Sequence, residues 1–189
     1  MAEPRCFGCF LHILGINKMN FNQKYTSAIT SINSIKTPIV FKKALSNNLL
    51  FGSESLDIGG GRYETLTKSL SDIGINNNIY DPYNRTPLQN ESALRKCGEY
   101  DIAIISNVLN VICESSIRHW LVSLACNSLR DGGILLITVY EGNKSGIGKA
   151  SKKDCWQENR KTIDYVNDVK CHFKNVNIKN GLIYAYKGN

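Results

Sequence analysis

The stretch SLDIGGGR, residues 55–62, decides the fold of this chain. Its first half is typical of a short buried strand, its three glycines of a sharp turn, and the residues from Tyr63 onward of a helix. Glycines let the backbone turn tightly and lie close to a ligand because they carry no Cβ. The N–H groups of such a turn, and of the helix start that follows, can bind polar or anionic groups. We therefore expect a strand–turn–helix unit with a ligand at the turn.

A second acidic residue follows at an informative distance. A short strand over residues 78–80 is expected to end at Asp81, 24 residues after Asp57. In doubly wound nucleotide-binding folds, an acidic residue about 20 residues after the glycine turn reaches the ribose hydroxyls. A carboxylate suits this role because it can accept from both hydroxyls. Pro82 and Tyr83 follow directly, and we interpret Tyr83 as a neighbour of an adenine; the alternative is a proline turn with a surface tyrosine.

The apolar run YDIAII, residues 100–105, is expected to be a strand buried on both faces. It leads into Ser106, Asn107 and Asn110, in a loop at the switch point where open α/β sheets bind ligands. Amide side chains there could contact a substrate, so Asn107 and Asn110 are candidate catalytic residues. The alternative is that they cap the strand end and the next helix.

The remaining pattern completes an α/β order. Apolar spacing predicts helices over 22–35, 39–45, 63–73, 89–97, 115–129 and 156–169. Strands are predicted over 53–58, 78–80, 100–105, 134–140, 173–178 and 182–186. Asn180-Gly181 joins the last two strands as a hairpin. Only 20 residues separate Asp81 from Asp101, so the usual third strand is expected to be reduced or missing.

Two features flank the carboxyl end of the strand over 134–140. Glu141 follows it directly, so it is expected to face the site and is the candidate carboxylate for a proton-transfer role. The segment 142–155 is rich in glycine and lysine, and is expected to be a mobile loop. Over the ligand edge of a sheet it could act as a lid or a substrate clamp, and the alternative is an ordinary surface loop.

Length and composition bound the rest. The 189 residues fit a single domain over 21–189 with an N-terminal arm over 1–20. No apolar run reaches about 18 residues, so no membrane span is expected. Seven scattered cysteines favour reduced thiols and a cytoplasmic protein. Cys6, Cys9 and His12 resemble half a zinc site, but no second cysteine pair follows, so no metal is expected.

The net charge of +7 is unevenly distributed. Residues 1–50 carry six basic and one acidic side chain, and residues 144–161 carry six basic and two acidic. The core between them, residues 51–143, carries seven basic and eleven acidic side chains. Basic segments around an acidic core favour an anionic partner such as DNA or RNA. The alternative is a lysine-rich solvated surface.

The motifs LDIGGGR, YDPYNR and SNVLNVI, with short spacings, resemble class I S-adenosylmethionine-dependent methyltransferases. More narrowly, they resemble small phage-type methyltransferases and a methyltransferase-like protein associated with DNA phosphorothioation. The resemblance implies an α/β Rossmann-like sheet with helices on both faces, a reduced third strand and a C-terminal antiparallel hairpin. It also implies S-adenosyl-L-methionine as the cofactor.

The resemblance assigns roles by position. Asp57, Gly59, Gly60 and Gly61 would hold the methionine part of the cofactor, and Asp81 the ribose. The other cofactor-binding positions would be Tyr25, Pro82, Tyr83, Ser106 and Asn107, with Tyr25 closing over the carboxylate end. The chain departs from the family pattern where Tyr63 replaces a third glycine, and where no acidic residue matches the adenine ligand.

Three functions follow as alternatives. The first is methyl transfer to nucleic acid, which the basic flanking segments favour. The second is methyl transfer to a small molecule, which a closed pocket would favour over an open basic groove. The third is a cofactor-binding or nucleic-acid-binding module without catalysis.

Overall fold

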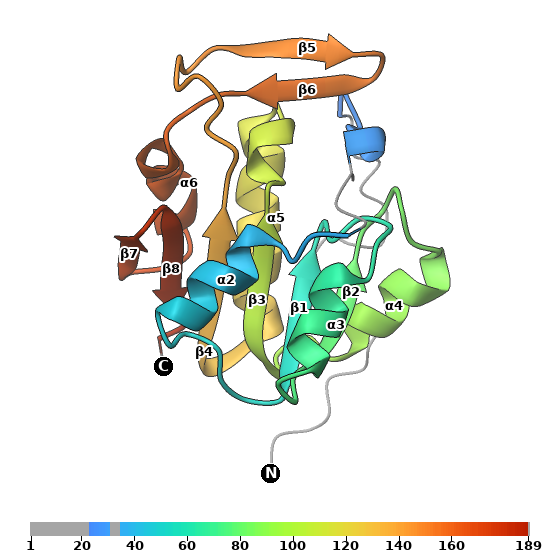
Figure 1. Ribbon diagram of the computed structural model, residues 1–189, viewed down its shortest axis with the longest axis vertical. Coiled ribbons are helices and arrows are strands. Elements are labelled where there is room, and N and C mark those ends of the chain that lie inside the picture. Colours follow the sequence, from blue (N-terminus) through green and yellow to red (C-terminus); the bar gives the residue numbers. More distant parts are fainter. Residues whose placement is uncertain (1–22, 31–34, 189) are drawn as a thin grey trace.

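The computed structural model describes residues 23–30 and 35–188 (Figure 1). Its centre is a six-stranded sheet in the order β2-β1-β3-β4-β8-β7. The strands are β1 (Glu54–Ile58), β2 (Asn76–Tyr80), β3 (Tyr100–Ser106), β4 (Leu129–Thr138), β7 (Val176–Lys179) and β8 (Leu182–Tyr186). The first four run parallel, β8 pairs antiparallel with β4, and β7 pairs antiparallel with β8. This arrangement confirms the α/β fold class expected from the sequence.

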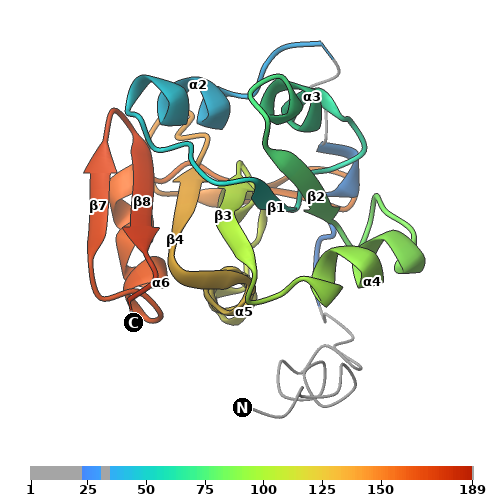
Figure 2. The same ribbon diagram turned by 90° about the horizontal axis from the view of Figure 1, so that it is seen from below.

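Helices cover both faces of the sheet (Figure 2). One face carries α2 (Ile39–Ser46) and α3 (Thr65–Ser71); the other carries α4 (Pro87–Arg95), α5 (Ser115–Ser128) and α6 (Val166–Lys170). The described residues also form three short 3-10 turns: η2 (Ala28–Thr30), η3 (Leu109–Val111) and η4 (Thr162–Tyr165). Each face has its own apolar core, because β3 and β4 present buried side chains to both sides.

The strand that usually follows β2 in this fold is missing from the described residues between Asp81 and Asp101, as expected. The chain leaves β2, forms only α4, and returns as β3, so β2 is the edge of the sheet. Thr86 and Gln89 form a reciprocal capping box at the start of α4. The closing hairpin is also confirmed: Asn180 and Gly181 both have positive φ, at 53° and 67°, as a tight two-residue turn requires.

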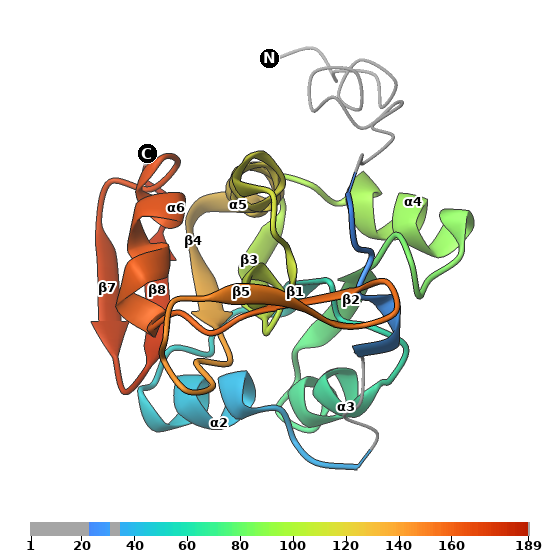
Figure 3. The ribbon, with the colours of Figure 1, turned by 90° about the horizontal axis from the view of Figure 1, so that it is seen from above.

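Residues 142–169 differ from the prediction. The expected loop contains β5 (Gly148–Lys152), which pairs antiparallel with β6 (Cys155–Glu158). The predicted helix over 156–169 was therefore wrong in its first part, where β6 lies, and the helical residues begin only at η4. The β5–β6 hairpin crosses the edge of the sheet formed by the carboxyl ends of β1, β2 and β3 (Figure 3).

The predicted helix over 22–35 was also wrong within residues 23–30, where the structure has only η2. Ser27 has a φ of 52°, and its N–H donates to the carbonyl of Asp154 at 2.9 Å. This segment therefore hydrogen-bonds to the β5–β6 hairpin instead of to its own next turn. The expected arm over 1–20, including Cys6, Cys9 and His12, lies outside the described residues. Within residues 23–30 and 35–188, no helix has the length and apolarity to cross a membrane.

Candidate functional site

A cavity of about 690 Å³ lies at the carboxyl ends of β1, β2 and β3, and residues of the β5–β6 hairpin also line it. Most of the predicted site residues line it: Asp57, Gly59, Gly60, Gly61, Asp81, Pro82, Tyr83, Ser106, Asn107 and Asn110. They meet there because parallel strands end on the same edge of the sheet. Tyr25 and Glu141 are described but do not line this cavity.

The glycine turn needs its glycines for two physical reasons. Gly59 and Gly61 have φ values of 76° and 72°, in the left-handed region that side chains rarely adopt. A Cβ on Gly59 would lie 2.6 Å from Cγ2 of Val108. A Cβ on Gly60 would collide with the carboxylate of Asp57. The turn therefore has no room for a side chain at Gly59 or Gly60, and all three glycines line the cavity.

Side chains from the loop after β2 hold this turn from both sides. The carboxylate of Asp81 accepts from the N–H of Gly61 at 2.9 Å, and Nε of Arg85 donates to the carbonyl of Gly61 at 2.8 Å. Arg85 also pairs with Glu64. Arg85 was not predicted as a site residue, although the motif YDPYNR contains it. Its role depends on the loop folding back over the turn, which no local pattern reveals.

Asp57 is the most perturbed group in the cavity. Its side chain is buried, and its Oδ1 has no hydrogen-bond partner. Burial, reinforced by the nearby Asp81, raises the pKa of Asp57 to about 7, although Arg85 acts in the opposite direction. A buried carboxylate oxygen without a partner is costly unless a ligand supplies a donor or a positive charge. The geometry thus fits a cationic ligand group at this position.

Asp81 already has several partners. Its Oδ1 accepts from the N–H groups of Tyr83 and Asn84, both at 2.9 Å, while Oδ2 accepts from Gly61. A ribose hydroxyl would compete with these donors for the remaining lone pairs. The ribose contact stays a prediction, and the structure adds a second role for Asp81, which is to hold the glycine turn in place.

One part of the cavity wall is apolar. Tyr80, at the end of β2, and Trp120, on α5, approach with ring centroids 6.3 Å apart and planes inclined by 54°. Ile117 and Leu121 of α5 line the same region. Trp120 packs against the core and also lines the cavity, and it was not predicted as a site residue. The apolar spacing over residues 115–129 predicts the helix, but it does not predict that α5 begins beside the cavity.

The loop after β3 carries the predicted amides to the cavity. Asn107 has a φ of 57°, and its N–H donates to the carbonyl of Thr138 at 2.8 Å. Asn110 is 2% exposed, and its amide donates to Oε1 of Gln157 at 3.4 Å. Gln157 of β6 also lines the cavity and was not predicted, because β6 itself was predicted as a helix.

Tyr25 lies elsewhere than expected. Its ring stacks on Trp156 of β6, with centroids 5.7 Å apart and planes inclined by 22°. The predicted closure over the cofactor carboxylate therefore has no support from the cavity lining. The aromatic pair instead fastens residues 23–27 to the hairpin.

Glu141 is engaged outside the cavity. One carboxylate oxygen accepts from the N–H of Thr162 at 2.6 Å, and the other pairs with Lys144 at 3.2 Å. These hydrogen bonds, chiefly from Thr162, lower the pKa of Glu141 to about 2. A carboxylate with so low a pKa is a poor proton acceptor. The predicted proton-transfer role is therefore not supported, and Glu141 instead ties the end of β4 to η4.

We predict that Glu141→Gln lowers the melting temperature at pH 7 and leaves cofactor affinity unchanged. The folded-state pKa lies below the ordinary value, so the carboxylate contributes stability above about pH 4.5 and loses it as the pH falls toward 2. The deficit of the variant should accordingly shrink in thermal melts at decreasing pH. A deficit that stays constant from pH 7 to pH 3 would contradict this assignment.

No family model and no curated protein matches this chain. Solved structures do match its fold. One is 1,6-didemethyltoxoflavin-N1-methyltransferase of Burkholderia thailandensis with bound 1,6-didemethyltoxoflavin and S-adenosylhomocysteine, at 15% identity and a TM-score of 0.61, covering 100% of this chain and 94% of that one. Another is an S-adenosylmethionine-dependent methyltransferase of Clostridium acetobutylicum, at 14% identity and a TM-score of 0.53, covering 98% and 100%.

A third is the T. thermophilus 16S rRNA methyltransferase in complex with AdoMet and guanosine, at 16% identity and a TM-score of 0.52. The match covers 83% of this chain but only 44% of that enzyme. At these identities the likeness concerns the fold. The chain therefore has the Rossmann-like fold of S-adenosylmethionine-dependent methyltransferases.

Proposed function

We propose that this chain is an S-adenosylmethionine-dependent methyltransferase whose cofactor binds in the cavity beside the glycine turn. The observation that carries the proposal is the unpartnered Oδ1 of Asp57, buried next to a turn that has no space for side chains. S-adenosylmethionine carries a positive amino group and a sulfonium, and either would complement this carboxylate. The shared methyltransferase fold supports the same assignment.

The cavity offers a place for each part of the cofactor. Asp57 and the backbone of the glycine turn would hold the methionine part. The apolar wall formed by Tyr80 and Trp120 would bind the adenine. No acidic residue of the sequence matches the adenine ligand of the family, so this contact would be apolar. Asp81 would contact the ribose while holding the turn. When bound, the sulfonium supplies a good leaving group, so the protein has mainly to align the acceptor and exclude water.

Nucleic acid is the acceptor class that the charges support best. Lys149, Lys152 and Lys153 lie on the β5–β6 hairpin, and Lys152 lines the cavity. Cationic side chains at the rim of a site attract phosphates, with an affinity that falls as salt rises. The small-molecule alternative has its own support, because the hairpin covers the cavity. Label transfer from S-adenosylmethionine would distinguish both from a binding module without catalysis.

The narrower likeness to small phage-type methyltransferases rests on the three sequence motifs. A cytoplasmic location is supported by Cys97, Cys113, Cys126, Cys155 and Cys171, which are free thiols in the described part of the chain. Disulfides are rare in reducing compartments, so free thiols are expected there.

The two tryptophans of the chain provide a direct test of the cofactor site. Trp120 lines the cavity, whereas Trp156 does not. We predict that S-adenosylhomocysteine changes the tryptophan emission of the Trp156→Phe protein, in which only Trp120 remains, and leaves that of Trp120→Phe nearly unchanged. The opposite pattern, or a saturable response in neither variant, would refute the proposed site.

A further inference from the structure

The β5–β6 hairpin supplies one wall of the cavity. Ser151, Lys152 and Gln157 of the hairpin face the same space as the glycine turn. The far end of the hairpin is fastened to residues 26 and 27. Thr26 donates to the carboxylate of Asp154, and Oγ of Ser27 accepts from the N–H of Trp156 at 3.1 Å. A molecule in the cavity therefore meets the hairpin as part of its binding surface.

Two amide side chains meet at this wall. Asn110 donates to Gln157 over 3.4 Å, and Oδ1 of Asn110 accepts from the N–H of Tyr140 over 3.5 Å. Both distances exceed the usual 2.9–3.0 Å of an N–H···O bond. Asn110 is 2% exposed, and it is among the residues that line the cavity. Nε2 of Gln157 also donates to the carbonyl of Glu158 at 3.0 Å. Among the described contacts, each amide therefore keeps one N–H and one acceptor lone pair for a ligand.

The chemistry of this pair specifies what it can bind. An amide presents a donor beside an acceptor in one plane, which matches the edge of a planar heterocycle, as in Asn and Gln contacts to adenine. A carboxylic acid would call for basic partners and an amine for acidic ones. The charged residues in the described lining are Asp57, Asp81 and Lys152. The two carboxylates are at the glycine turn, and Lys152 is on an exposed strand, so the amide pair itself favours an uncharged ring.

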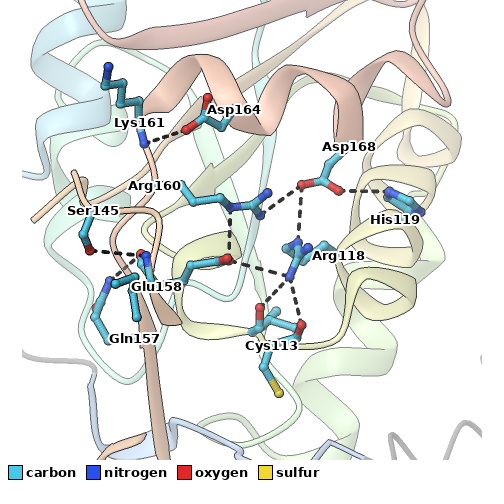
Figure 4. Close-up of polar contacts among 12 residues, drawn as sticks. Cys113, Arg118, His119, Ser145, Gln157, Glu158, Arg160, Lys161, Asp164 and Asp168 are labelled. Atoms are coloured by element: carbon cyan, nitrogen blue, oxygen red, sulfur yellow. Dashed lines mark hydrogen bonds and ion pairs between the residues drawn. The ribbon is translucent and has the colours of Figure 1, made fainter. Parts of the chain in front are cut away.

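A charge cluster made of Arg118, Glu158, Arg160 and Asp168 lies beside Gln157 (Figure 4). Arg118 and Asp168 are buried, and Glu158 and Arg160 are partly buried. Nε of Arg118 lies 3.3 Å from Asp168, and the guanidinium of Arg160 lies 3.1 Å from Glu158 and 3.5 Å from Asp168. His119 binds the other oxygen of Asp168 at 2.9 Å. Asp168 is therefore the hub that joins α5, α6 and the segment after β6.

The cluster holds both chain segments that carry the amides. Glu158 directly follows Gln157, so pairing it with Arg160 and Arg118 fixes the end of β6. Arg118 also donates to the carbonyls of Ile112 at 2.9 Å and Cys113 at 3.1 Å, just after the turn that contains Asn110. Because desolvation can offset the attraction within such ion pairs, we expect their main effect to be the selection of one arrangement of these segments.

We propose that Asn110 and Gln157 form the recognition pair for the methyl acceptor, a planar uncharged heterocycle with adjacent donor and acceptor atoms, such as a nucleobase. The charge cluster positions this pair, with Arg118 and Asp168 as positioning residues. The inference rests on the proposed methyltransferase function and names its substrate class. The same ring chemistry could be presented by a polynucleotide or by a free heterocycle.

The first test measures methyl transfer from labelled S-adenosylmethionine. The probes are four free nucleosides, mixed-sequence single-stranded RNA and DNA, benzylamine and benzoate. A nucleoside or polynucleotide should be methylated, and which of them reacts identifies the source of the ring. Gln157→Ala and Asn110→Ala should each lower kcat/KM by about 10- to 100-fold, since a bidentate base contact contributes ~1–3 kcal/mol. Asn127→Ala, an exposed asparagine on α5, is the matched control and should change nothing.

Affinity for S-adenosylhomocysteine separates the two claims. If the wild type does not bind it, the proposed function fails. If it binds, three results overturn the inference alone: unchanged kcat/KM in both amide variants, transfer to benzylamine or benzoate in preference to every heterocycle, or transfer to no heterocycle in the panel.

The second test concerns the charge cluster and needs no acceptor. Asp168→Asn should speed amide hydrogen exchange in residues 148–158 while S-adenosylhomocysteine affinity stays within about twofold. Asp101→Asn is the matched control, because Asp101 is similarly buried and pairs with Arg130 at 2.6 Å near the opposite ends of the strands. It should destabilise the protein without loosening residues 148–158. If residues 148–158 exchange equally fast in both variants, Asp168 does not position the amide pair. Once an acceptor is identified, Asp168→Asn should raise the KM for that acceptor more than it lowers kcat.

Discussion

Asp57→Asn should weaken S-adenosylmethionine binding by about 10- to 150-fold, the 1.5–3 kcal/mol of a hydrogen bond to a charged group. The same substitution should stabilise the free protein at pH 8. Burial raises the pKa of Asp57 from 3.8 to about 7, so ionisation favours the unfolded chain. Stability is therefore lost as the pH rises from about 4 to 7, and Asn, which does not ionise, avoids that loss.

Calorimetric titration and thermal melts at pH 5 and pH 8 check both effects. The melting-temperature gain of the variant should be larger at pH 8 than at pH 5. Asp72→Asn, on the exposed end of α3, serves as a control that should alter neither property. Full cofactor affinity in Asp57→Asn would exclude Asp57 as the ligand of the cationic group.

Gly59→Ala should strongly destabilise the protein and abolish cofactor binding. Its φ of 76° would cost a side chain about 1–2 kcal/mol. The new Cβ would also lie 2.6 Å from Val108, and such overpacking costs about 1–3 kcal/mol. Since Val108 begins the loop that carries Asn110, relieving the clash would displace the acceptor side of the cavity.

Two further variants, compared by their free energies of denaturant unfolding, separate the cost of the positive φ from the cost of the contact with Val108. Gly74→Ala has a similar φ of 82° but no atom within 4 Å of the new Cβ, so it should show the backbone cost alone. Gly59→Ala combined with Val108→Ala should recover the overpacking part, as a double-mutant cycle would measure. Equal losses in Gly59→Ala and Gly74→Ala would show that Val108 does not constrain the turn.

The parallel core was predictable because its signals are local. β3 is apolar on both faces, the three glycines mark the turn after β1, and Asn180-Gly181 specifies the closing hairpin. The short distance from Asp81 to Asp101 likewise left no room for a third strand. Each of these features can be recognised from one short continuous stretch of the sequence.

The β5–β6 hairpin was not predictable in the same way. β5 is mostly exposed and polar, so its sequence has no alternating apolar pattern. Its position is determined by distant partners: Ser27, Asn110 and the charge cluster around Asp168. The helix predicted over 22–35 was wrong within residues 23–30 for the same reason: Ser27 hydrogen-bonds to the distant hairpin.

The same distinction separates predicted from missed site residues. Residues at strand ends, such as Asp57 and Asn107, line the cavity because strand polarity determines where they emerge. Arg85, Trp120 and Gln157 reach the site only through tertiary folding. Glu141 also follows a strand end, yet its side chain turns away to Thr162.

The most direct test of the central claim is calorimetric titration of the wild-type protein with S-adenosylmethionine, S-adenosylhomocysteine and NAD at pH 8. The account predicts saturable one-to-one binding of the first two, with affinities in the micromolar range, and no binding of NAD. Absence of binding by both adenosyl sulfur compounds, or tighter binding of NAD, would contradict it.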